Sequence, residues 1–262
     1  MVKKLVLNDK IYNITSKERR KNIFLRYSKY LNGKTQGFSN TKVKIKKLRS
    51  FDNRFEVEIF GPEELFVYNL LKKEFGTIYQ FDQVSVSNIY KGLMVDVGKV
   101  GFGIFVDCGI LNPKVDVLIS LHAFREQLCD GKEKSLKEII KAFDFINNFP
   151  VYIEITHIKR EKKQIQGKIA YKTLNFYNKI LNENLEAVFV SGETKGQVKK
   201  ALIRKGHLRD IVSIDRYGFL ENIVILKDNT SAPGIIADIG KNLKNCKLSA
   251  IRPTNIKKLT NN

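Results

Sequence analysis

The sequence has no tryptophan and only three cysteines, three histidines, five prolines and two methionines among its 262 residues. Cys108, Cys129 and Cys246 are odd in number, widely spaced and never part of a CxxC pair. They therefore indicate neither a disulfide framework nor a zinc ribbon, and we expect three reduced packing residues. The histidines show no metal-ligand spacing, so no metal site is predicted.

Long apolar runs are also missing. No stretch of about 18 apolar residues is present, which excludes a membrane-spanning helix. The chain begins Met-Val-Lys-Lys and reaches polar Asn8-Asp9-Lys10 within ten residues, so a signal-peptide core is not indicated. We expect a cytoplasmic protein with no membrane partner.

Acidic residues are too few to balance the basic ones. The chain has 47 Lys and Arg against 27 Asp and Glu, a formal charge of +20. Residues 1–50 alone hold 15 basic and two acidic residues, whereas residues 51–150 are close to neutral. This excess favours a polyanionic partner, although a solvated lysine-rich surface would give the same count.

The first part of the chain, residues 1–82, predicts a basic domain of ferredoxin-like order, strand–helix–strand–strand–helix–strand. Thr15-Ser16-Lys17-Glu18 predicts a capping box, and Asn32-Gly33 predicts the end of the helix that follows. The expected strands are Lys3–Tyr12, Thr41–Leu48, Phe55–Phe60 and a short one at Ile78–Phe81, with a second helix between Gly61-Pro62 and Gly76.

The last part, residues 182–262, repeats the same βαββαβ order. The expected elements are strand Glu186–Val190, helix Thr194–Lys205, strands Asp210–Asp215 and Asn222–Lys227, helix Ala232–Leu243 and strand Lys247–Arg252.

The middle part, residues 83–181, has a different pattern, in which short strand-like runs are separated by glycines. The expected strands are Ile89–Val97, Lys99–Asp107, Val115–Ser120, Val151–Ile158 and Gln164–Ala170. Five short strands with an interposed helix, here Leu136–Ala142, indicate a Greek-key barrel of the OB type. The predicted fold class is therefore α+β, with a central OB β-barrel flanked by two ferredoxin-like α/β sandwich domains.

One motif in this middle part points to RNA. Gly101-Phe102-Gly103-Ile104-Phe105-Val106-Asp107-Cys108-Gly109, followed by Asp116-Val117-Leu118-Ile119-Ser120, resembles the S1-type RNA-binding domain over about ninety residues. The resemblance implies an S1-like barrel in which Phe102 and Phe105 stack on unpaired bases. The two rings are three residues apart, so strict alternation would separate them unless a bulge at Gly103 intervenes; we expect at least one to be exposed.

The sequence departs from the S1 pattern at two places. Ser120 stands where many members carry a histidine, with His122 two residues later. The loop before the last strand has cations where members carry Asp and Arg, namely Lys159, Arg160, Lys162 and Lys163. These cations are predicted to contact phosphate. The long insertion Leu121–Asn148 is expected to dock the barrel onto its neighbours.

A second resemblance covers nearly the whole chain. Asp96–Gly103, Gly206–Asp210 and Ser231–Ile236 are similar to an archaeal family catalogued only as a domain of unknown function. This resemblance implies an archaeal cytoplasmic protein and supplies no activity or catalytic residue.

Further cations extend the predicted RNA contact beyond the barrel. They are Lys17, Arg19 and Arg20 near the start, and Lys195, Lys199, Arg204, His207 and Arg209 in the last part. At Ser191–Gly196, a helix start would bind phosphate through free amides or simply be capped. His207 and Asp210 have no evident nucleophile beside them, and no Walker or dinucleotide motif is present, so we expect no catalysis and no cofactor.

These patterns together predict a non-catalytic RNA-binding or ribonucleoprotein-associated factor. Its partner would be the ribosome, tRNA, or the transcription or RNA-processing machinery. Two alternatives stay open: a protein–protein adaptor whose S1-like barrel is degenerate, and an orphan enzyme acting on a phosphorylated metabolite.

Overall fold

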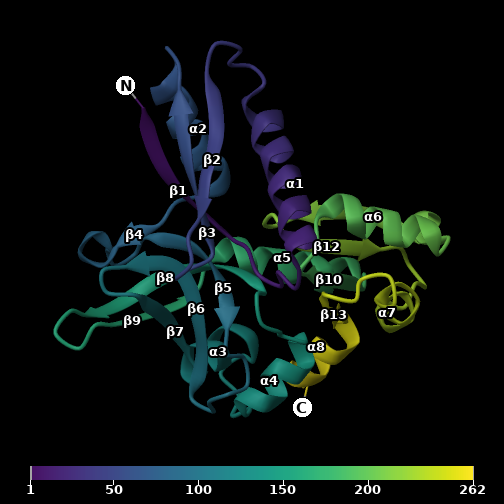
Figure 1. The fold of residues 1–262 in the computed structure, drawn as a ribbon. Coiled ribbons are helices and arrows are strands. Elements are labelled where there is room, and N and C mark those ends of the chain that lie inside the picture. The colour runs from purple at the N-terminus through teal and green to yellow at the C-terminus, as the bar shows by residue number, and fades with distance from the viewer. Residues whose placement is uncertain (1, 262) are drawn as a thin grey trace. The chain divides into compact units, whose positions relative to one another are not determined.

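A computed structural model describes residues 2–261, which form two compact units that meet between Ile78 and Tyr79 (Figure 1). The first unit is a three-stranded antiparallel sheet with two helices. Its elements are β1 (Lys3–Lys10), α1 (Lys17–Thr35), β2 (Lys42–Leu48), β3 (Arg54–Phe60) and α2 (Glu64–Phe75). The strand order is β1-β3-β2, and β3 pairs antiparallel with both neighbours, as in a ferredoxin-like sandwich.

The predicted fourth strand of this sheet is wrong. Among residues 2–261, a single antiparallel bridge, between Leu7 and Thr77, occupies the outer side of β1. The next residues form β4 (Tyr79–Gln80), which pairs in parallel with a barrel strand of the second unit. The side chains explain the difference, because Tyr79 packs edge to face on Tyr90 of the barrel, with ring centroids 4.7 Å apart.

Helix α1 begins and ends differently from the prediction. Its N-cap is Ser16, whose side chain accepts from the Arg19 amide at 3.1 Å. The helix therefore begins one residue later than a capping box from Thr15 to Glu18 requires. The helix also passes through Gly33 and continues to Thr35. Thr35 lies one turn beyond buried Leu31 and donates its hydroxyl to the Leu31 carbonyl at 3.2 Å, which extends the buried stripe.

The second unit begins with a five-stranded closed barrel. After the short 3₁₀ helix η1 (Phe81–Gln83), its strands are β5 (Ile89–Val95), β6 (Gly103–Leu111), β7 (Val115–Ser120), β8 (Pro150–Lys159) and β9 (Gln164–Ile169). Neighbouring strands follow the order β6-β5-β8-β9-β7, and the β6–β7 pairing closes the ring. Only the β7–β9 pairing within this ring is parallel, which is the connectivity of an OB barrel.

Strand β6 starts four residues later than predicted. The amide of Lys99 donates to the Asp96 carbonyl at 3.0 Å, and Asp96 and Gly98 have φ of 53° and 81°. This turn keeps residues 96–102 out of the strand. Glycine serves the turn because positive φ costs it no Cβ clash.

The long insertion folds into two helices, α3 (Leu121–Leu128) and α4 (Leu136–Phe143), of which only the second was predicted. Asp144, directly after α4, holds the sheet that follows: it accepts from the Ala250 amide through Oδ2 at 2.6 Å and from the Ser249 hydroxyl through its carbonyl at 2.5 Å. The insertion thus contacts the last sheet, while its predicted docking onto the first part of the chain stays a prediction.

The remainder of the second unit is a complete ferredoxin-like sandwich. Its elements are α5 (Tyr171–Glu183), β10 (Ala187–Ser191), α6 (Lys195–Arg204), the 3₁₀ helix η2 (His207–Asp210), β11 (Ile211–Arg216), β12 (Glu221–Leu226), α7 (Ala232–Gly240), β13 (Lys247–Ile251) and α8 (Pro253–Asn261). The four strands are antiparallel in the order β11-β12-β10-β13, which confirms the predicted βαββαβ fold.

Alternate residues of β10 serve two different cores. Val188 and Val190 pack under α6 and α7, while Ala187 and Phe189 join the core that fills the barrel. Because both faces of this strand are buried, its residues form an unbroken apolar run rather than an alternating one. The sequence did not predict helices α5 and α8. They contribute Tyr177 and other buried side chains to the core that fills the barrel.

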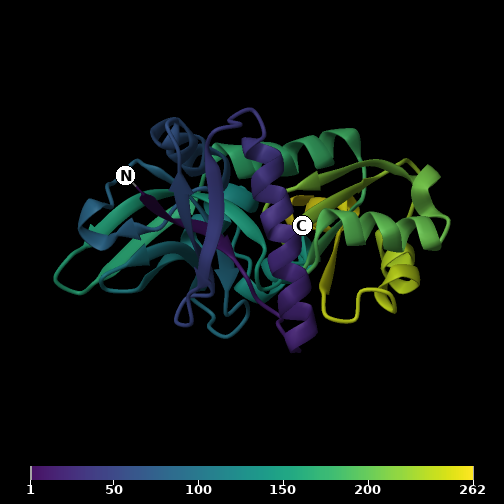
Figure 2. The same ribbon diagram turned by 45° about the horizontal axis from the view of Figure 1, so that its top comes forward.

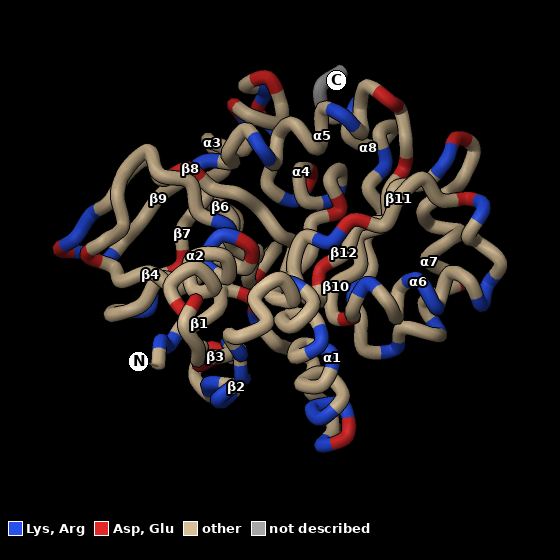
Figure 3. Tube along the Cα trace, turned by 90° about the horizontal axis from the view of Figure 1, so that it is seen from above, with Lys and Arg blue, Asp and Glu red and all other residues tan. Residues whose placement is uncertain are grey.

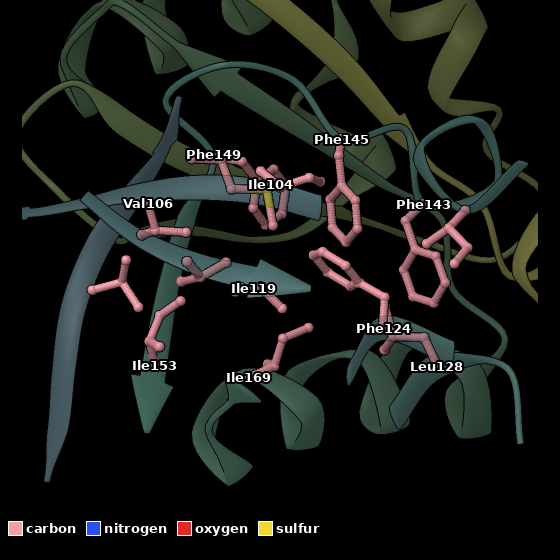
Figure 4. Close-up of a cluster of buried hydrophobic side chains, with 14 of the residues drawn as sticks. Ile104, Val106, Ile119, Phe124, Leu128, Phe143, Phe145, Phe149, Ile153 and Ile169 are labelled. Carbon is pink, nitrogen blue, oxygen red and sulfur yellow. The ribbon is translucent and has the colours of Figure 1, made fainter. Parts of the chain in front are cut away.

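Aromatic rings make the core that fills the barrel continuous with the sheet of β10–β13. Phe124, Phe143 and Phe145 lie side by side (Figure 4), and Phe149 reaches Phe189 of the sheet with ring centroids 4.6 Å apart. The predicted boundary at residue 182 falls inside α5, which spans Tyr171–Glu183. The three-part division of the chain thus stays a prediction, while the structure shows two compact units.

The structure also bears on the predictions for the cysteines and for membrane-spanning helices. The three cysteines are reduced, and Cys108 and Cys129 are buried as packing residues. Within residues 2–261, no helix has both the length and the apolar character needed to cross a bilayer.

Candidate nucleic-acid interface

Three strands present a row of side chains in register on the outside of the barrel. Phe105 on β6 is paired with Leu118 on β7, and Leu118 with Gln166 on β9. All three are partly exposed, whereas the preceding residues Ile104 and Val117 are buried in the core. Because side chains alternate along a strand, the row faces away from the barrel interior.

Phe102 joins this row from the turn before β6. Its side chain is 56% exposed, and its ring meets Phe105 edge to face, with centroids 6.2 Å apart and planes at 90°. The expectation that at least one ring is exposed is confirmed. The alternation problem does not arise, since Phe102 precedes the strand. Gly103 between them is required, because a Cβ there would lie 2.3 Å from the Ile119 carbonyl oxygen.

A groove of about 570 Å³ lies along this row. It brings together three residues that the sequence singled out, namely Phe102, Phe105 and Lys163. The sequence marked Asp96 only as part of a motif, and it did not single out the other important lining residues, which are Lys114, Asp116, Leu118, Gln164 and Gln166. The alternation of residues 115–120 could have placed Asp116 and Leu118 on one face, but only the strand register shows what lies opposite them.

The groove combines apolar rings with charges of both signs. Lys114 and Lys163 supply cations, and Asp96 and Asp116 supply carboxylates. Asp96 also pairs with Lys99 at 2.7 Å, and both side chains are exposed. Exposed ion pairs of this kind contribute little stability, so they can rearrange around a ligand at low cost.

The loop between β8 and β9 divides its predicted cations between two roles. Lys163 lines the groove in a left-handed conformation, with φ of 50°. Arg160 instead donates to the carbonyls of Phe81 and Val84, at 3.4 and 3.2 Å, and lies over the Phe81 ring. Lys159 and Lys162 are exposed outside the groove lining. Arg160 therefore holds the start of the barrel, a role that the sequence did not predict.

The position expected to replace the S1 histidine has a structural role. Ser120 is the N-cap of α3 and accepts from the Ala123 amide at 3.2 Å. His122 is exposed on α3 and lies 3.2 Å from Glu126. The residue opposite Phe105 is Leu118, so this part of the face offers an apolar contact rather than an imidazole.

The predicted cations of the last part lie on and after α6 (Figure 3). Lys195 and Lys199 are one turn apart and share a face of the helix, while Arg204 lies on another side. Lys199, Arg204 and Arg209 are exposed, and Lys195 is half-buried.

His207 is already engaged by two carboxylates. Its Nδ1 lies 2.8 Å from Asp210 and its Nε2 2.9 Å from Asp238. The hydrogen bond with Asp210, followed by that with Asp238, raises the pKa of His207 above its ordinary value, while burial opposes this shift. His207 thus links η2 to α7 through both ring nitrogens, and its predicted phosphate contact stays a prediction.

The start of α6 was expected either to be capped or to bind phosphate. The buried carboxylate of Glu193 accepts from the Thr194 amide at 3.0 Å, at the point where the helix begins. A carboxylate of the chain itself thus interacts with the positive end of this helix. Thr194, the N-cap of α6, makes no side-chain capping hydrogen bond, so capping and phosphate binding at Ser191–Gly196 both stay predictions.

The predicted cations of the first unit differ in the contacts that their side chains make within the chain. Lys17 is exposed at the start of α1. Arg19 donates through Nε to the Asn13 carbonyl at 2.7 Å, and Arg20 lies 5.6 Å from the centroid of the Phe24 ring. Lys17 and Arg20 can reach a phosphate, whereas Arg19 holds the turn that precedes the helix.

Known structures resemble parts of the chain only distantly. An uncharacterized protein from Methanocaldococcus jannaschii is 17% identical, with a TM-score of 0.24, over 34% of this chain and 96% of its own. A chain of an a/eIF2alpha–aDim2p–rRNA complex from Pyrococcus horikoshii is 8% identical, with a TM-score of 0.26, over 49% and 70%. The intact alpha subunit of aIF2 from Pyrococcus abyssi is 9% identical, with a TM-score of 0.25, over 64% and 97%. Such scores carry no functional argument.

Sequence-based family models match far more clearly. No curated protein matches the chain. The DUF2110 central domain matches residues 84–178, which hold the barrel, and the DUF2110 C-terminal domain matches residues 185–251, which hold the last sheet. These two matches together span more than half of the sequence. The chain belongs to the DUF2110 family.

Proposed function

We propose that this protein is a non-catalytic RNA-binding or ribonucleoprotein-associated factor that holds single-stranded RNA in the barrel groove. One observation carries the proposal: the Phe102–Phe105 ring pair lies in the same groove as Lys114 and Lys163. A base that stacks on an exposed aromatic ring contributes about 1–3 kcal/mol, and neighbouring cations follow the phosphates.

The ring geometry favours single strands over duplexes. Because the two rings stand at 90° to each other, a base stacked on the exposed ring of Phe102 cannot continue as a parallel stack onto Phe105. The next base must turn away, which a flexible single strand allows and a base-paired helix does not.

Exposed cations outside the groove would strengthen the attraction without adding sequence preference. Lys17, Arg20, Lys199, Arg204 and Arg209 belong to this set, on a chain of net charge +20. Such charges speed association and make affinity depend on salt.

Fluorescence anisotropy of the full chain with a labelled single-stranded RNA at low salt tests the proposal. We expect binding that weakens with salt, that is stronger than binding to a duplex of equal length, and that Phe102→Ala lowers. Absence of binding at low salt, or equal affinity for the duplex with no effect of Phe102→Ala, would overturn it. Purification from cells with and without nuclease would then identify the RNA.

A further inference from the structure

The first unit has a free sheet edge beside a groove. β2 is the last strand in the order β1-β3-β2, and no described strand pairs with its other side. Helix α1 runs alongside β2 in Figure 1 and Figure 2, and a groove of about 820 Å³ is lined by residues of both elements. The groove therefore borders main-chain groups that no sheet neighbour occupies.

The lining of this groove is largely uncharged and combines apolar side chains with neutral polar ones, among them Ser28, Asn32 and Gln36. Phe24 and Leu25 line it from α1, and Val43 and Ile45 from β2. Leu25 is 53% exposed. None of the many cations of α1 lines the groove, and its only lysines are Lys42 and Lys44 of β2. Such a lining suits the side chains of a peptide better than a polyanion, which requires cations along its path.

The lysines of β2 lie on the opposite face of the strand from its apolar residues. Lys42 and Lys44 are exposed and alternate with Val43 and Ile45. Lys46 pairs with Glu58 at 3.1 Å and Glu56 at 3.4 Å, and Lys47 pairs with Glu56 at 3.6 Å. Hydrogen bonding to Glu58 raises the pKa of Lys46.

By contrast, Lys42 and Lys44 have no carboxylate within ion-pair distance in the described part of the chain, and Lys44 instead lies 5.9 Å from the Phe60 ring centroid. Two uncompensated cations therefore remain beside the free edge.

The neighbouring strand β3 shows which sequence complements β2. On its buried side β3 offers Val57 and Ile59, and on its open side Glu56 and Glu58, which face the lysines. A strand added to the free edge would meet Val43 and Ile45 on one face and Lys42 and Lys44 on the other, and all four residues line the groove. It would need the same alternation of apolar and acidic residues.

We propose that the free edge of β2 docks an extended segment of a partner protein, with alternating acidic and apolar residues, as an added strand. Main-chain hydrogen bonds to β2 supply affinity, and the groove and the lysines select the side chains. Lysines on an edge strand ordinarily prevent unwanted pairing. Here Lys42 and Lys44 disfavour a basic strand by charge repulsion and favour an acidic one by attraction. A register shift between Ile45 and Lys47 limits the regular edge to the first half of β2.

A peptide taken from the chain itself provides the probe. A labelled peptide with the sequence of residues 54–60, RFEVEIF, carries the required alternation, and its partner in the test is the same peptide with both glutamates replaced by lysine. We expect saturable binding of the first to the full chain, at least tenfold tighter than that of the second. Amide NMR signals of residues 42–45 should shift while those of β1 stay in place.

Two double variants separate this surface from general charge. Lys42→Glu with Lys44→Glu should weaken peptide binding about tenfold, because two attractive contacts become repulsive. Lys21→Glu with Lys29→Glu makes the same change at exposed positions of α1 outside the groove and should have little effect.

Equal binding of the two peptides, or equal loss in the two double variants, would overturn the proposal. Shifted β1 amides would show displacement of β3 instead of edge addition, and displacement of the peptide by single-stranded RNA would assign the groove to nucleic acid. Both outcomes contradict edge docking. Because this surface shares no residue with the barrel groove, its failure leaves the proposed RNA function untouched.

Discussion

Phe102 and Phe105 meet edge to face at a centroid distance of 6.2 Å, although only Phe105 belongs to strand β6. The turn before the strand frees Phe102 from alternation, and Gly103 leaves room for the close approach of β7. The pair therefore presents one exposed ring supported by a second, half-buried one. This relationship is the physical basis for the first prediction.

Phe102→Ala is expected to lower affinity for single-stranded RNA about 5- to 150-fold, the equivalent of losing one stacked base at about 1–3 kcal/mol. The free energy of unfolding should change little, because the side chain is 56% exposed. Anisotropy titrations and urea unfolding measure the two effects. Tyr171→Ala removes a ring that is 75% exposed and outside the groove, and should leave binding intact. Equal losses in both variants would contradict stacking at Phe102.

Lys163→Asn and Arg160→Ala should have different effects, although the two residues share one loop. Asparagine tolerates the left-handed backbone at residue 163, so that variant should fold normally and reduce the magnitude of the salt slope of RNA binding by about 0.7. Arg160→Ala should instead cost about 0.5–1.5 kcal/mol of stability, because two main-chain carbonyls lose their donor. Salt titrations and urea unfolding distinguish them, and a reversed pattern would exclude the two assigned roles.

His207 should make stability depend on pH. Its raised pKa means that the folded state holds the imidazolium more tightly than the unfolded chain, whose ordinary value is 6.5. The contribution is complete below that value and is lost as pH rises through the folded pKa. The stability difference between wild type and His207→Ala should therefore be largest in acid and shrink towards alkaline pH in urea unfolding. His157→Ala, at an exposed position, serves as the control; a difference that grows with pH would refute the linkage.

Asp144→Gly should detach α4 from the last sheet. The change keeps the left-handed conformation, φ of 49°, but removes the carboxylate that accepts from the Ala250 amide. We expect a loss of about 1–3 kcal/mol, typical of a hydrogen bond to a charged group. Asp144→Asn retains an oxygen acceptor and should lose less. If the two variants unfold at the same urea concentration, the carboxylate does not hold the sheet.

Much of the fold follows from local patterns. The run Val115–Ser120 became β7 without a change of bounds, because strict alternation and flanking turns determine a strand locally. The βαββαβ order of the last part likewise followed from its helix and strand periods. The fourth strand of the first unit did not form because Tyr79 packs on Tyr90 of the barrel, a contact between residues of different predicted domains.

The residues of the candidate site also divide into those that local sequence patterns mark and those that only the structure reveals. Phe102, Phe105 and Lys163 could be selected from the sequence because a motif and a charged loop mark them. Lys114, Leu118 and Gln166 could not, since nothing local distinguishes an outward residue that faces a ring from one that faces water. The sequence showed the charge of Arg160 and His207, but it did not show the Val84 carbonyl and the Asp238 carboxylate that engage them, because these groups come from distant segments.

The sequence by itself determined the S1-like motif, the period of most elements and the charge of +20. Each of these depends on residues close together in the chain. Only the tertiary structure decided which cations remain free, which aromatic rings share a groove, and that barrel and last sheet have one continuous core. These properties depend on strand register and on contacts between distant segments, where a shift of one residue would turn Phe105 from the groove into the barrel interior.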